Sequence, residues 1–301
     1  MNKEIWCLYG ATASGKTEMA MRIASSHPVE ILCMDAFQIY QEIPILSAAP
    51  EPEDLAKIPH HGFAFLRPDQ SFSVVEWYEK TVALILQVWE RNKIPMLVGG
   101  TGLYLKLIQS GLEDTGTTTD PLFRKNLESS AENKDPHWLW EELNKVWPQR
   151  AEKLHFNDKK RIIRALEIHN SPNSLQYGQI RDELAQFCPG WKKIWLNPDR
   201  ELLYHRINQR VLLMEARGLV GEVEKLQRQY AVQGTIKQAI GYKETLGFLE
   251  GTLSREAWIQ CIQQNTRRFA KRQLTWFRAQ QDYWECSSVS DVLPWLRQTT
   301  V

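Results

Sequence analysis

The sequence predicts an α/β fold, in which a P-loop, parallel-sheet core carries helices on both faces and is interrupted by a helical insertion domain. Three observations predict it. Strand-like apolar runs alternate with amphipathic helical patterns early in the chain, and a glycine-rich loop joins the first strand to the first helix. A helical stretch then interrupts the alternation before strand character returns at KKIWLNP (192–198).

The first elements alternate between strand and helix. Residues 5–9 form the first predicted strand, and a Met, Ala and Ile pattern after the loop predicts a helix. VEILCMD (29–35) is a second buried strand, FSVVEWYEKTVALILQVWERN (72–92) has helical spacing, and IPMLVGG (94–100) is a third strand before another helix. Ligands of parallel sheets bind at the carboxyl ends of the strands. We therefore expect the loop, Asp35 and Thr101 to meet at one site.

The polar segment EDTGTTTDP (113–121) predicts the exit from this core. We expect the core to consist of residues 1–113 and 194–301, the latter with a basic C-terminal helix. Residues 114–193 would be the insertion, which we expect to be all-helical because DPHWLWEELNKVW and NDKKRIIRALEIHN have helical spacing.

The composition of the chain indicates which class of protein it belongs to and argues against several others. A chain of 301 residues with 43% hydrophobic and 24% charged residues is an ordinary globular protein. The net charge of +1 means that any nucleic-acid binding depends on local patches. The five cysteines lie far apart, which argues against a zinc site or a disulfide framework. The sequence also lacks a signal-peptide pattern and any apolar run of membrane-spanning length, so we expect a cytoplasmic protein without a membrane partner.

The segment after the first strand has the P-loop pattern Gly-x4-Gly-Lys-Thr. Its glycines let backbone N–H groups point inward, and the helix N-terminus and a lysine add positive charge, so the expected ligand is a phosphate or diphosphate. The hydroxyl of Thr17 would be a ligand of Mg²⁺, the expected cofactor. The expected diphosphate- or nucleotide-binding residues are Gly10, Ala11, Thr12, Ala13, Ser14, Gly15, Lys16 and Thr17.

Two polar residues lie at the ends of the second and third predicted strands, at the same expected edge of the sheet as the glycine-rich loop. Asp35 either caps a turn, binds a metal, or accepts a proton from a nucleophile. Thr101, in GGTGLY, either caps the following helix or contacts the ligand. Arg206 and Arg210 are four residues apart and form either an exposed helix face or part of the phosphate site. The adjacent His60 and His61 are expected in a loop.

Two helices carry clustered positive charge. NTRRFAKRQLTWFR (265–278) has five cations and no acid, with aromatic residues between them, and NDKKRIIRALE (157–167) places Lys159, Lys160, Arg161 and Arg164 behind a cap. Cations of one sign interleaved with aromatics are typical of surfaces that bind single-stranded RNA. A basic surface helix whose aromatics all belong to the core remains the alternative.

Taken together, these motifs resemble the tRNA dimethylallyltransferase family, also called tRNA isopentenyltransferases. The resemblance covers nearly the whole chain and rests on GATASGKT, Asp35 with IY after it, LVGGTGLYLK, NDKKRIIRALE, AIGYKE and TRRFAKRQLTWFR, in the order of the family. It implies transfer of a prenyl group from dimethylallyl diphosphate to the exocyclic amine of the adenosine just after the anticodon of tRNA.

The resemblance also implies roles for individual residues. Lys16 and Arg210 would hold the diphosphate, Asp35 would be the general base, and Thr101 would contact the donor near the breaking bond. The implied tRNA-binding residues are Asp35, Ala36, Phe37, Gln38, Thr101, Arg124, Lys160, Arg161, Arg164, Gln238, Gly241, Tyr242, Lys243, Lys271, Arg272, Gln273, Trp276 and Arg278. The partner would be a tRNA anticodon stem-loop, bound by a monomer.

The sequence departs from the family pattern at several positions. Ala11 and Ala36 stand where the family has proline and serine, and LSAAP (46–50) replaces GTAKP. SPNSLQY (171–177) replaces a segment with Thr-Gly-Lys. These departures bear on RNA affinity and substrate choice more than on donor binding.

Two other functions fit parts of the pattern. A small-molecule or nucleotide kinase would bind ATP at the same loop, but it leaves the basic, aromatic C-terminal helix unexplained. A non-catalytic RNA-binding descendant of the family would keep the basic helices without the chemistry.

Overall fold

The computed structural model describes residues 3–114, 120–171, 179–187, 190–232, 234–288 and 290–292. It divides into two compact units, one from Met1–Gln109 with Glu183–Val301 and one from Ser110–Asp182. Most of the polar segment 113–121, the predicted exit from the core, lies outside the described residues. So does nearly all of SPNSLQY (171–177), which departs from the family pattern.

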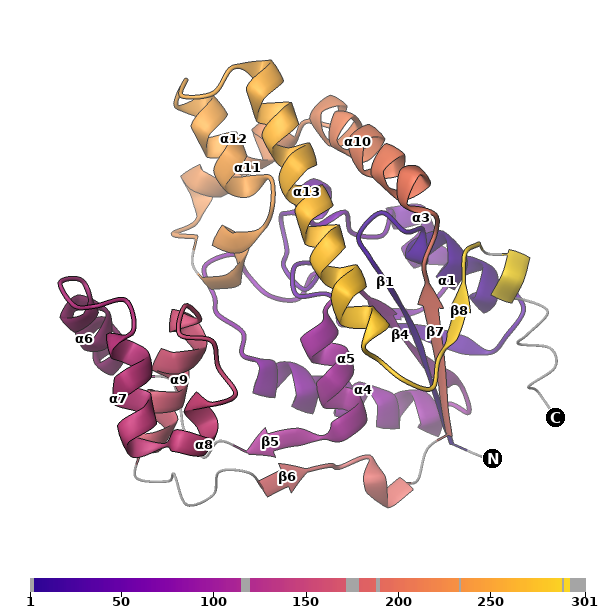
Figure 1. The fold of residues 1–301 in the computed structure, drawn as a ribbon. Helices are drawn as coiled ribbons and strands as arrows, with labels where there is room; N and C mark the ends of the chain where they lie inside the picture. Colours follow the sequence, from indigo (N-terminus) through magenta and orange to yellow (C-terminus); the bar gives the residue numbers. More distant parts are fainter. Residues whose placement is uncertain are drawn as a thin grey trace. The chain divides into compact units, whose positions relative to one another are not determined.

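The larger unit is built on a six-stranded sheet whose strand pairs all run parallel, in the order β3-β2-β4-β1-β7-β8. Its strands are β1 (Glu4–Gly10), β2 (Val29–Cys33), β3 (His60–His61), β4 (Ile94–Gly99), β7 (Gly190–Leu196) and β8 (Trp284–Cys286). β1 lies between β4 and β7, so the glycine-rich loop leaves the sheet from its interior (Figure 1). The predicted α/β core is confirmed.

Helices cover both faces of this sheet because the strand side chains alternate. Trp6 and Leu8 pack in one hydrophobic cluster with Met19 and Ile23 of the helix after the loop. Tyr9 points to the opposite face and contacts the ring of Phe277, with 5.1 Å between the ring centroids. The helices of this unit are α1 (Lys16–Ala24), α2 (Pro44–Ser47), α3 (Pro52–Lys57), α4 (Val74–Glu90), α5 (Gly102–Ser110), α10 (Arg200–Ala216), α11 (Leu219–Gln229), α12 (Tyr242–Leu249), α13 (Arg255–Arg278) and the short 3-10 turns η2 (Ala185–Phe187) and η3 (Gly234–Gln238).

The helix boundaries follow local capping chemistry. The Ser73 hydroxyl accepts the backbone N–H of Glu76, while the Glu76 carboxylate accepts the N–H of Ser73, which together form a capping box at the start of α4. Ser254 caps α13 by accepting the N–H of Ala257. α13 is the long helix that runs down beside β1 in Figure 1, and its Phe277 contacts Tyr9 of that strand. It therefore brings the basic C-terminal segment to the sheet.

The smaller unit contains α6 (Pro121–Ala131), α7 (Trp138–Val146), α8 (Pro148–Ala151), α9 (Lys159–His169) and the antiparallel pair β5 (Leu112–Asp114) and β6 (Gln179–Arg181). Its core joins Leu139 and Leu143 of α7 to Ile162 and Leu166 of α9. These residues recur at three- or four-residue spacing, so each helix buries one face.

The structure corrects four expectations. The predicted insertion 114–193 ends too late, because β7 begins at Gly190 and pairs with Glu4 of β1, and the unit itself spans Ser110–Asp182. The insertion is also not all-helical, since β5 pairs with β6. His60 and His61 form the edge strand β3 rather than a loop. β8 was not predicted, because a strand of only three residues leaves little periodicity.

No helix within the described residues is long and apolar enough to span a membrane.

Candidate active site

The glycine-rich loop runs from the end of β1 into α1 and has the shape of an anion-binding turn. Gly15 precedes α1 with φ of 101°, a left-handed conformation that glycine adopts without strain, and Ala13 has φ of 62°. The Ser14 N–H donates to the Ala11 carbonyl at 3.2 Å, which closes the turn. The first N–H groups of α1 have no intrahelical partner and carry the positive end of the helix dipole. The loop is therefore suited to a phosphate group.

The Lys16 ammonium lies against this loop. Its Nζ donates to the carbonyls of Gly10 at 3.1 Å and Ala11 at 2.8 Å. Burial lowers the pKa of Lys16 to about 8, and nearby Asp35 opposes this shift while Arg210 adds to it. The Lys16 amine therefore carries a positive charge below about pH 8 and loses it as the pH rises above that value.

Two arginines of α10 reach the same loop. Arg206 Nη1 donates to the Ser14 carbonyl at 3.0 Å, and Arg210 Nη1 donates to the Thr12 hydroxyl at 3.0 Å. Burial lowers the pKa of Arg210, although Asp35 works in the opposite direction. The sequence left open whether this pair formed an exposed face. The structure brings both guanidinium groups to the phosphate loop, and Arg206 is a residue absent from the predicted site.

Asp35 and Thr101 follow adjacent strands and are linked through the backbone. The Asp35 carboxylate accepts the N–H of Phe37 at 2.9 Å, and the Thr101 hydroxyl accepts the N–H of Ala36 at 3.1 Å. Thr101 N–H donates to the Met34 carbonyl at 3.3 Å. A Cβ at Gly99 would lie 1.9 Å from that same carbonyl oxygen, so only glycine permits this close approach of the two strand ends.

The phosphate loop and the end of β4 are also joined by α13. Thr12 N–H donates to Gln273 Oε1 at 2.8 Å, and Gln273 Nε2 donates to the Gly100 carbonyl at 2.8 Å. One helical turn later, the Trp276 ring packs so closely on Gly102 that a Cβ there would lie 2.6 Å from it. Gln273, which we predicted to contact tRNA, lines the cavity described below, and its amide binds two protein loops.

These groups line one cavity of about 670 Å³ within the larger unit. Its lining includes the polar and cationic residues Thr12, Lys16, Thr17, Asp35, Arg206 and Arg210. It also includes the apolar residues Ile45, Leu46, Ile207, Val211, Met214 and Ile262, whereas Thr101 is not part of the lining. The cavity therefore suits a ligand that carries both an anionic group and a hydrocarbon group.

The donor set of this cavity fits Mg²⁺. Magnesium keeps several waters and takes one or two oxygen ligands from protein together with phosphate oxygens. The Thr17 hydroxyl and the Asp35 carboxylate are oxygen donors in the lining. Within the described residues no group of three or more His, Cys, Asp or Glu side chains is placed to hold a metal, so a site built by protein ligands alone is not available there.

Other implied tRNA-binding residues of this unit fall into three groups, which line the cavity, are exposed or are buried. Phe37, Gln38 and Gln238 line the cavity, as does Arg272, whose guanidinium lies 5.7 Å from the Phe269 ring centroid. Lys243, Lys271 and Arg278 are exposed. Gly241 and Tyr242 are buried, and the Tyr242 hydroxyl is bonded to Gln227.

A second basic hollow lies on the same unit and was not predicted. Lys237, Lys243, Arg268 and Arg272 contribute four cations to it, together with Glu244 and Asn265. Its volume is about 390 Å³. Because Arg272 lines both this hollow and the larger cavity, the two share a wall.

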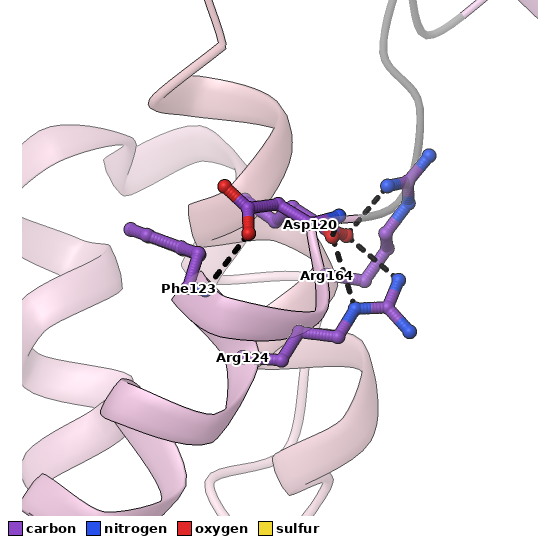
Figure 2. Close-up of polar contacts among 5 residues, drawn as sticks. Asp120, Phe123, Arg124 and Arg164 are labelled. Carbon is purple, nitrogen blue, oxygen red and sulfur yellow. Dashed lines mark hydrogen bonds and ion pairs between the residues drawn. The ribbon is translucent and has the colours of Figure 1, made fainter.

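The cations of the smaller unit differ in their surroundings. Arg124 and Arg164 converge on one carboxylate, as Figure 2 shows, and that carboxylate belongs to Glu167. The Glu167 side chain is only 2% exposed, and it also accepts the backbone N–H of Asp120. Burial alone would raise the pKa of Glu167, but these bonds outweigh it and lower the pKa. Lys160 and Arg161 are exposed, and Arg161 makes a long pair with Asp158 at 3.4 Å.

The segment that departs from GTAKP forms a wall of the cavity. Leu46, where the family has glycine, is buried and lines it, and the N–H groups of Ile45 and Leu46 donate to the Glu222 carboxylate at 2.8 and 2.7 Å. A Cβ at Gly241 would lie 3.0 Å from Leu46 Cδ1. The larger side chain is thus accommodated against a glycine.

Comparisons with known proteins address the family. A family model described as IPP transferase matches residues 38–280, and one described as isopentenyl transferase matches residues 3–61. The chain belongs to the IPP transferase family. A tRNA dimethylallyltransferase from Carboxydothermus hydrogenoformans is 38% identical to it over 92% of this chain and 90% of that protein. One from Desulforamulus reducens is 40% identical over 83% of this chain and 88% of that protein.

Solved structures of IPP transferases agree with this assignment. The tRNA isopentenylpyrophosphate transferase of Bacillus halodurans superposes with a TM-score of 0.70 at 31% identity and covers 98% of this chain and 96% of its own. A eukaryotic dimethylallyltransferase acting on tRNA superposes with a TM-score of 0.77 at 26% identity, over 98% of this chain and 77% of its own. The resemblance found in the sequence is therefore confirmed.

Proposed function

We propose that this enzyme is a tRNA dimethylallyltransferase. It transfers a dimethylallyl group from dimethylallyl diphosphate to the exocyclic N6 amine of the adenosine on the 3′ side of the anticodon. The observation that carries this proposal is the composition of the cavity. Lys16 and Arg210 contribute cationic groups, Ile207, Met214 and other apolar residues contribute hydrocarbon wall, and Asp35 lies in the same lining.

The phosphate loop would hold the diphosphate as a leaving group. When the bond between the donor's C1 and its bridging oxygen breaks, negative charge develops on pyrophosphate. Lys16, Arg206 and Arg210, which lie at the phosphate loop, would stabilise that charge, and such preorganised charge is usually a large contribution to catalysis. The Thr17 hydroxyl would hold Mg²⁺, which would supply a further positive charge to the leaving group.

Asp35 would act on the acceptor. As the N6 nitrogen forms its bond to C1, it gains a positive charge and must lose a proton, and the Asp35 carboxylate accepts that proton. The bond between Asp35 and the N–H of Phe37 fixes one carboxylate oxygen at the strand end. Thr101 would orient the Asp35 turn and the donor, because its hydroxyl is bonded next to Asp35 in the chain.

The acceptor base would have to leave its stack to enter the cavity, as in other enzymes that act on a nucleobase. Phe37, Gln38, Gln238 and Arg272 would line its path because they line the cavity. The exposed cations Lys243, Lys271 and Arg278, with Trp276, would hold the loop backbone, and so would Lys160, Arg161, Arg124 and Arg164 of the smaller unit. We further propose that the enzyme acts as a monomer in the cytoplasm.

The test compares two candidate substrates in parallel reactions. Purified protein is incubated with Mg²⁺, an anticodon stem-loop and either labelled dimethylallyl diphosphate or labelled ATP. We expect a prenylated adenosine, identified by mass spectrometry of the digested RNA, and release of pyrophosphate. Turnover of ATP without prenyl transfer would indicate a kinase instead. Stem-loop binding with neither reaction would indicate a non-catalytic RNA-binding protein.

A further inference from the structure

Both polar atoms of the Gln273 side chain are hydrogen-bonded beside the phosphate loop. Gln273 is only 8% exposed. Its carbonyl oxygen accepts the Thr12 N–H and its amide nitrogen donates to the Gly100 carbonyl, each at 2.8 Å. One partner can only donate and the other can only accept, so the two contacts fix the orientation of the amide.

This arrangement selects which backbone donors of the loop face the ligand. The Thr12 N–H is used by Gln273 and the Ser14 N–H is used by the Ala11 carbonyl. The backbone donors left for an anion are then the N–H groups of Ala13 and Gly15 and those at the start of α1. Thr12 itself also accepts a hydrogen bond from Arg210. Its backbone and its side chain are thus held by two helices.

The amide of Gln273 packs tightly against Gly100. A Cβ at Gly100 would lie 2.5 Å from Gln273 Nε2 and 3.2 Å from the Gly10 carbonyl oxygen. The amide therefore lies where the strand ends of β1 and β4 come close together, and a side chain at position 100 would displace it. The next residue toward the N-terminus is Arg272, which lines the cavity, and α13 carries both.

We propose that Gln273 is a positioning residue for the pyrophosphate leaving group. By bridging Thr12 to Gly100, it holds the phosphate loop in the shape that binds a diphosphate and keeps that loop in register with the strand end next to Asp35. The inference rests on the proposed function, because it names pyrophosphate as the group that the loop stabilises.

The test compares Gln273→Glu and Gln273→Met with Gln260→Glu, a matched control at an exposed position of the same helix. Pyrophosphate affinity in the presence of Mg²⁺ is measured by calorimetry at pH 5.5 and pH 8, alongside thermal unfolding and transfer kinetics. At pH 8 the carboxylate of Gln273→Glu has no proton for the Gly100 carbonyl and repels an anion. We expect its pyrophosphate affinity to fall about tenfold or more, and the control to match the wild type.

The pH dependence separates positioning from a general loss of packing. At pH 5.5 the buried carboxyl of Gln273→Glu is protonated and can donate again, so its deficit relative to the wild type should shrink severalfold. Gln273→Met fills a similar volume without polar atoms, and we expect a tenfold deficit at both pH values. If both variants bind pyrophosphate within twofold of the wild type, or if the deficit of Gln273→Glu is the same at both pH values, the proposal is overturned. Wild-type protein that binds no pyrophosphate overturns it as well.

The same data keep the two proposals apart. If the wild type transfers no prenyl group but its pyrophosphate affinity still depends on Gln273 in this way, the proposed function fails and the positioning role stands. If the wild type prenylates RNA and the Gln273 variants behave like the control, the positioning role fails alone.

Discussion

Arg210 and Thr12, 198 residues apart in the chain, meet in a hydrogen bond of 3.0 Å between the guanidinium Nη1 and the threonine hydroxyl. The bond places a partly buried cation beside the phosphate loop, from a helix that follows the insertion in the chain. Arg206 and Arg210 of α10 therefore both contact the phosphate loop.

Replacing Arg210 should weaken donor use. Arg210→Met removes a charge-assisted contact to the loop and to the diphosphate, and such contacts contribute about 1.5–3 kcal/mol. We expect kcat/KM for dimethylallyl diphosphate to fall roughly 10- to 100-fold. Arg200→Met, at the exposed start of the same helix, is the control. Equal kinetics for the two variants would remove Arg210 from the donor site.

Removing the proton acceptor should affect the chemical step alone. Asp35→Asn keeps an oxygen that can accept the Phe37 N–H, so the turn is retained while the base is lost. We expect kcat to drop by roughly 10²- to 10⁴-fold, the usual contribution of a positioned base. Pyrophosphate affinity, measured by calorimetry, should stay within about twofold because hydrogen bonding in the turn is unchanged. A variant with wild-type kcat would show that Asp35 is not the base.

The affinity for pyrophosphate should fall as the pH rises through about 8. Burial lowers the pKa of Lys16 to about 8, below its value in the unfolded chain, so the folded protein loses this positive charge as the pH passes that value. Titrations from pH 6.5 to 9.5 would measure the effect. Lys16→Met, which has no such proton, serves as the reference for the ionisation of pyrophosphate itself. Parallel pH profiles for wild type and variant would contradict this assignment.

The ion pairs of Glu167 should stabilise the smaller unit. Glu167→Gln leaves Arg124 and Arg164 without their buried counter-charge. The two arginine side chains are 37% and 31% exposed, so water offsets part of the cost. We therefore expect the free energy of unfolding of this unit to fall by about 2 kcal/mol, less than the full cost of breaking a buried pair. Hydrogen exchange in α6 and α9 measures it locally. Glu128→Gln, at an exposed position of α6, is the control.

The contribution of Glu167 also has a defined pH dependence. Its pKa is lower in the folded protein than in the unfolded chain, so the stabilisation is complete above the ordinary pKa of glutamate and is lost as the pH falls through the lowered value. Protection of α6 and α9 that is equal in Glu167→Gln and wild type at neutral pH would show that the pairs do not stabilise this unit.

In the smaller unit, we expect the exposed cations to contribute more to RNA binding than the cations that are paired with Glu167. Lys160 and Arg161 are exposed, whereas Glu167 offsets part of the charge of Arg124 and Arg164. We expect Lys160→Ala with Arg161→Ala to lower tRNA affinity and to reduce the slope of log K against log salt by about 0.7–0.9 for each lost phosphate contact. Lys134→Ala, an exposed cation of the same unit, is the control. An unchanged slope would exclude these two residues from the RNA interface.

Local patterns were sufficient to predict the centre of this site. The glycines, Lys16 and Thr17 lie within one short segment, and Asp35 and Thr101 each follow an apolar strand, so strand order alone brings them to one edge. Arg210 was predicted at the diphosphate through the family resemblance. Arg206 was left open because helical spacing cannot distinguish solvent from a ligand.

The remaining features depend on contacts between distant segments. Gln273 binds Thr12, 261 residues away, and nothing in its neighbourhood distinguishes it from a polar residue on a basic helix. The predicted strand KKIWLNP begins two residues after the start of β7 at Gly190, because a single glycine and tryptophan before the lysines give no strand periodicity. Of the described residues of this strand, Ile194–Leu196 pair with β8, while the Lys192 ammonium lies over the Trp6 ring at 4.9 Å and Lys193 Nζ donates to the Gln281 carbonyl at 2.8 Å.

The central position of β1 has a consequence for how the protein is made on the ribosome. β1 is synthesised first, yet its neighbour β7 emerges only after the smaller unit, and Gln273 emerges later still. The nascent chain must therefore carry an unpaired strand edge through most of translation, while the separate core of the smaller unit can already form from contacts within its own segment. A truncated chain that ends before α13 would keep the glycine-rich motif but lack the side chain that joins it to the neighbouring strand end.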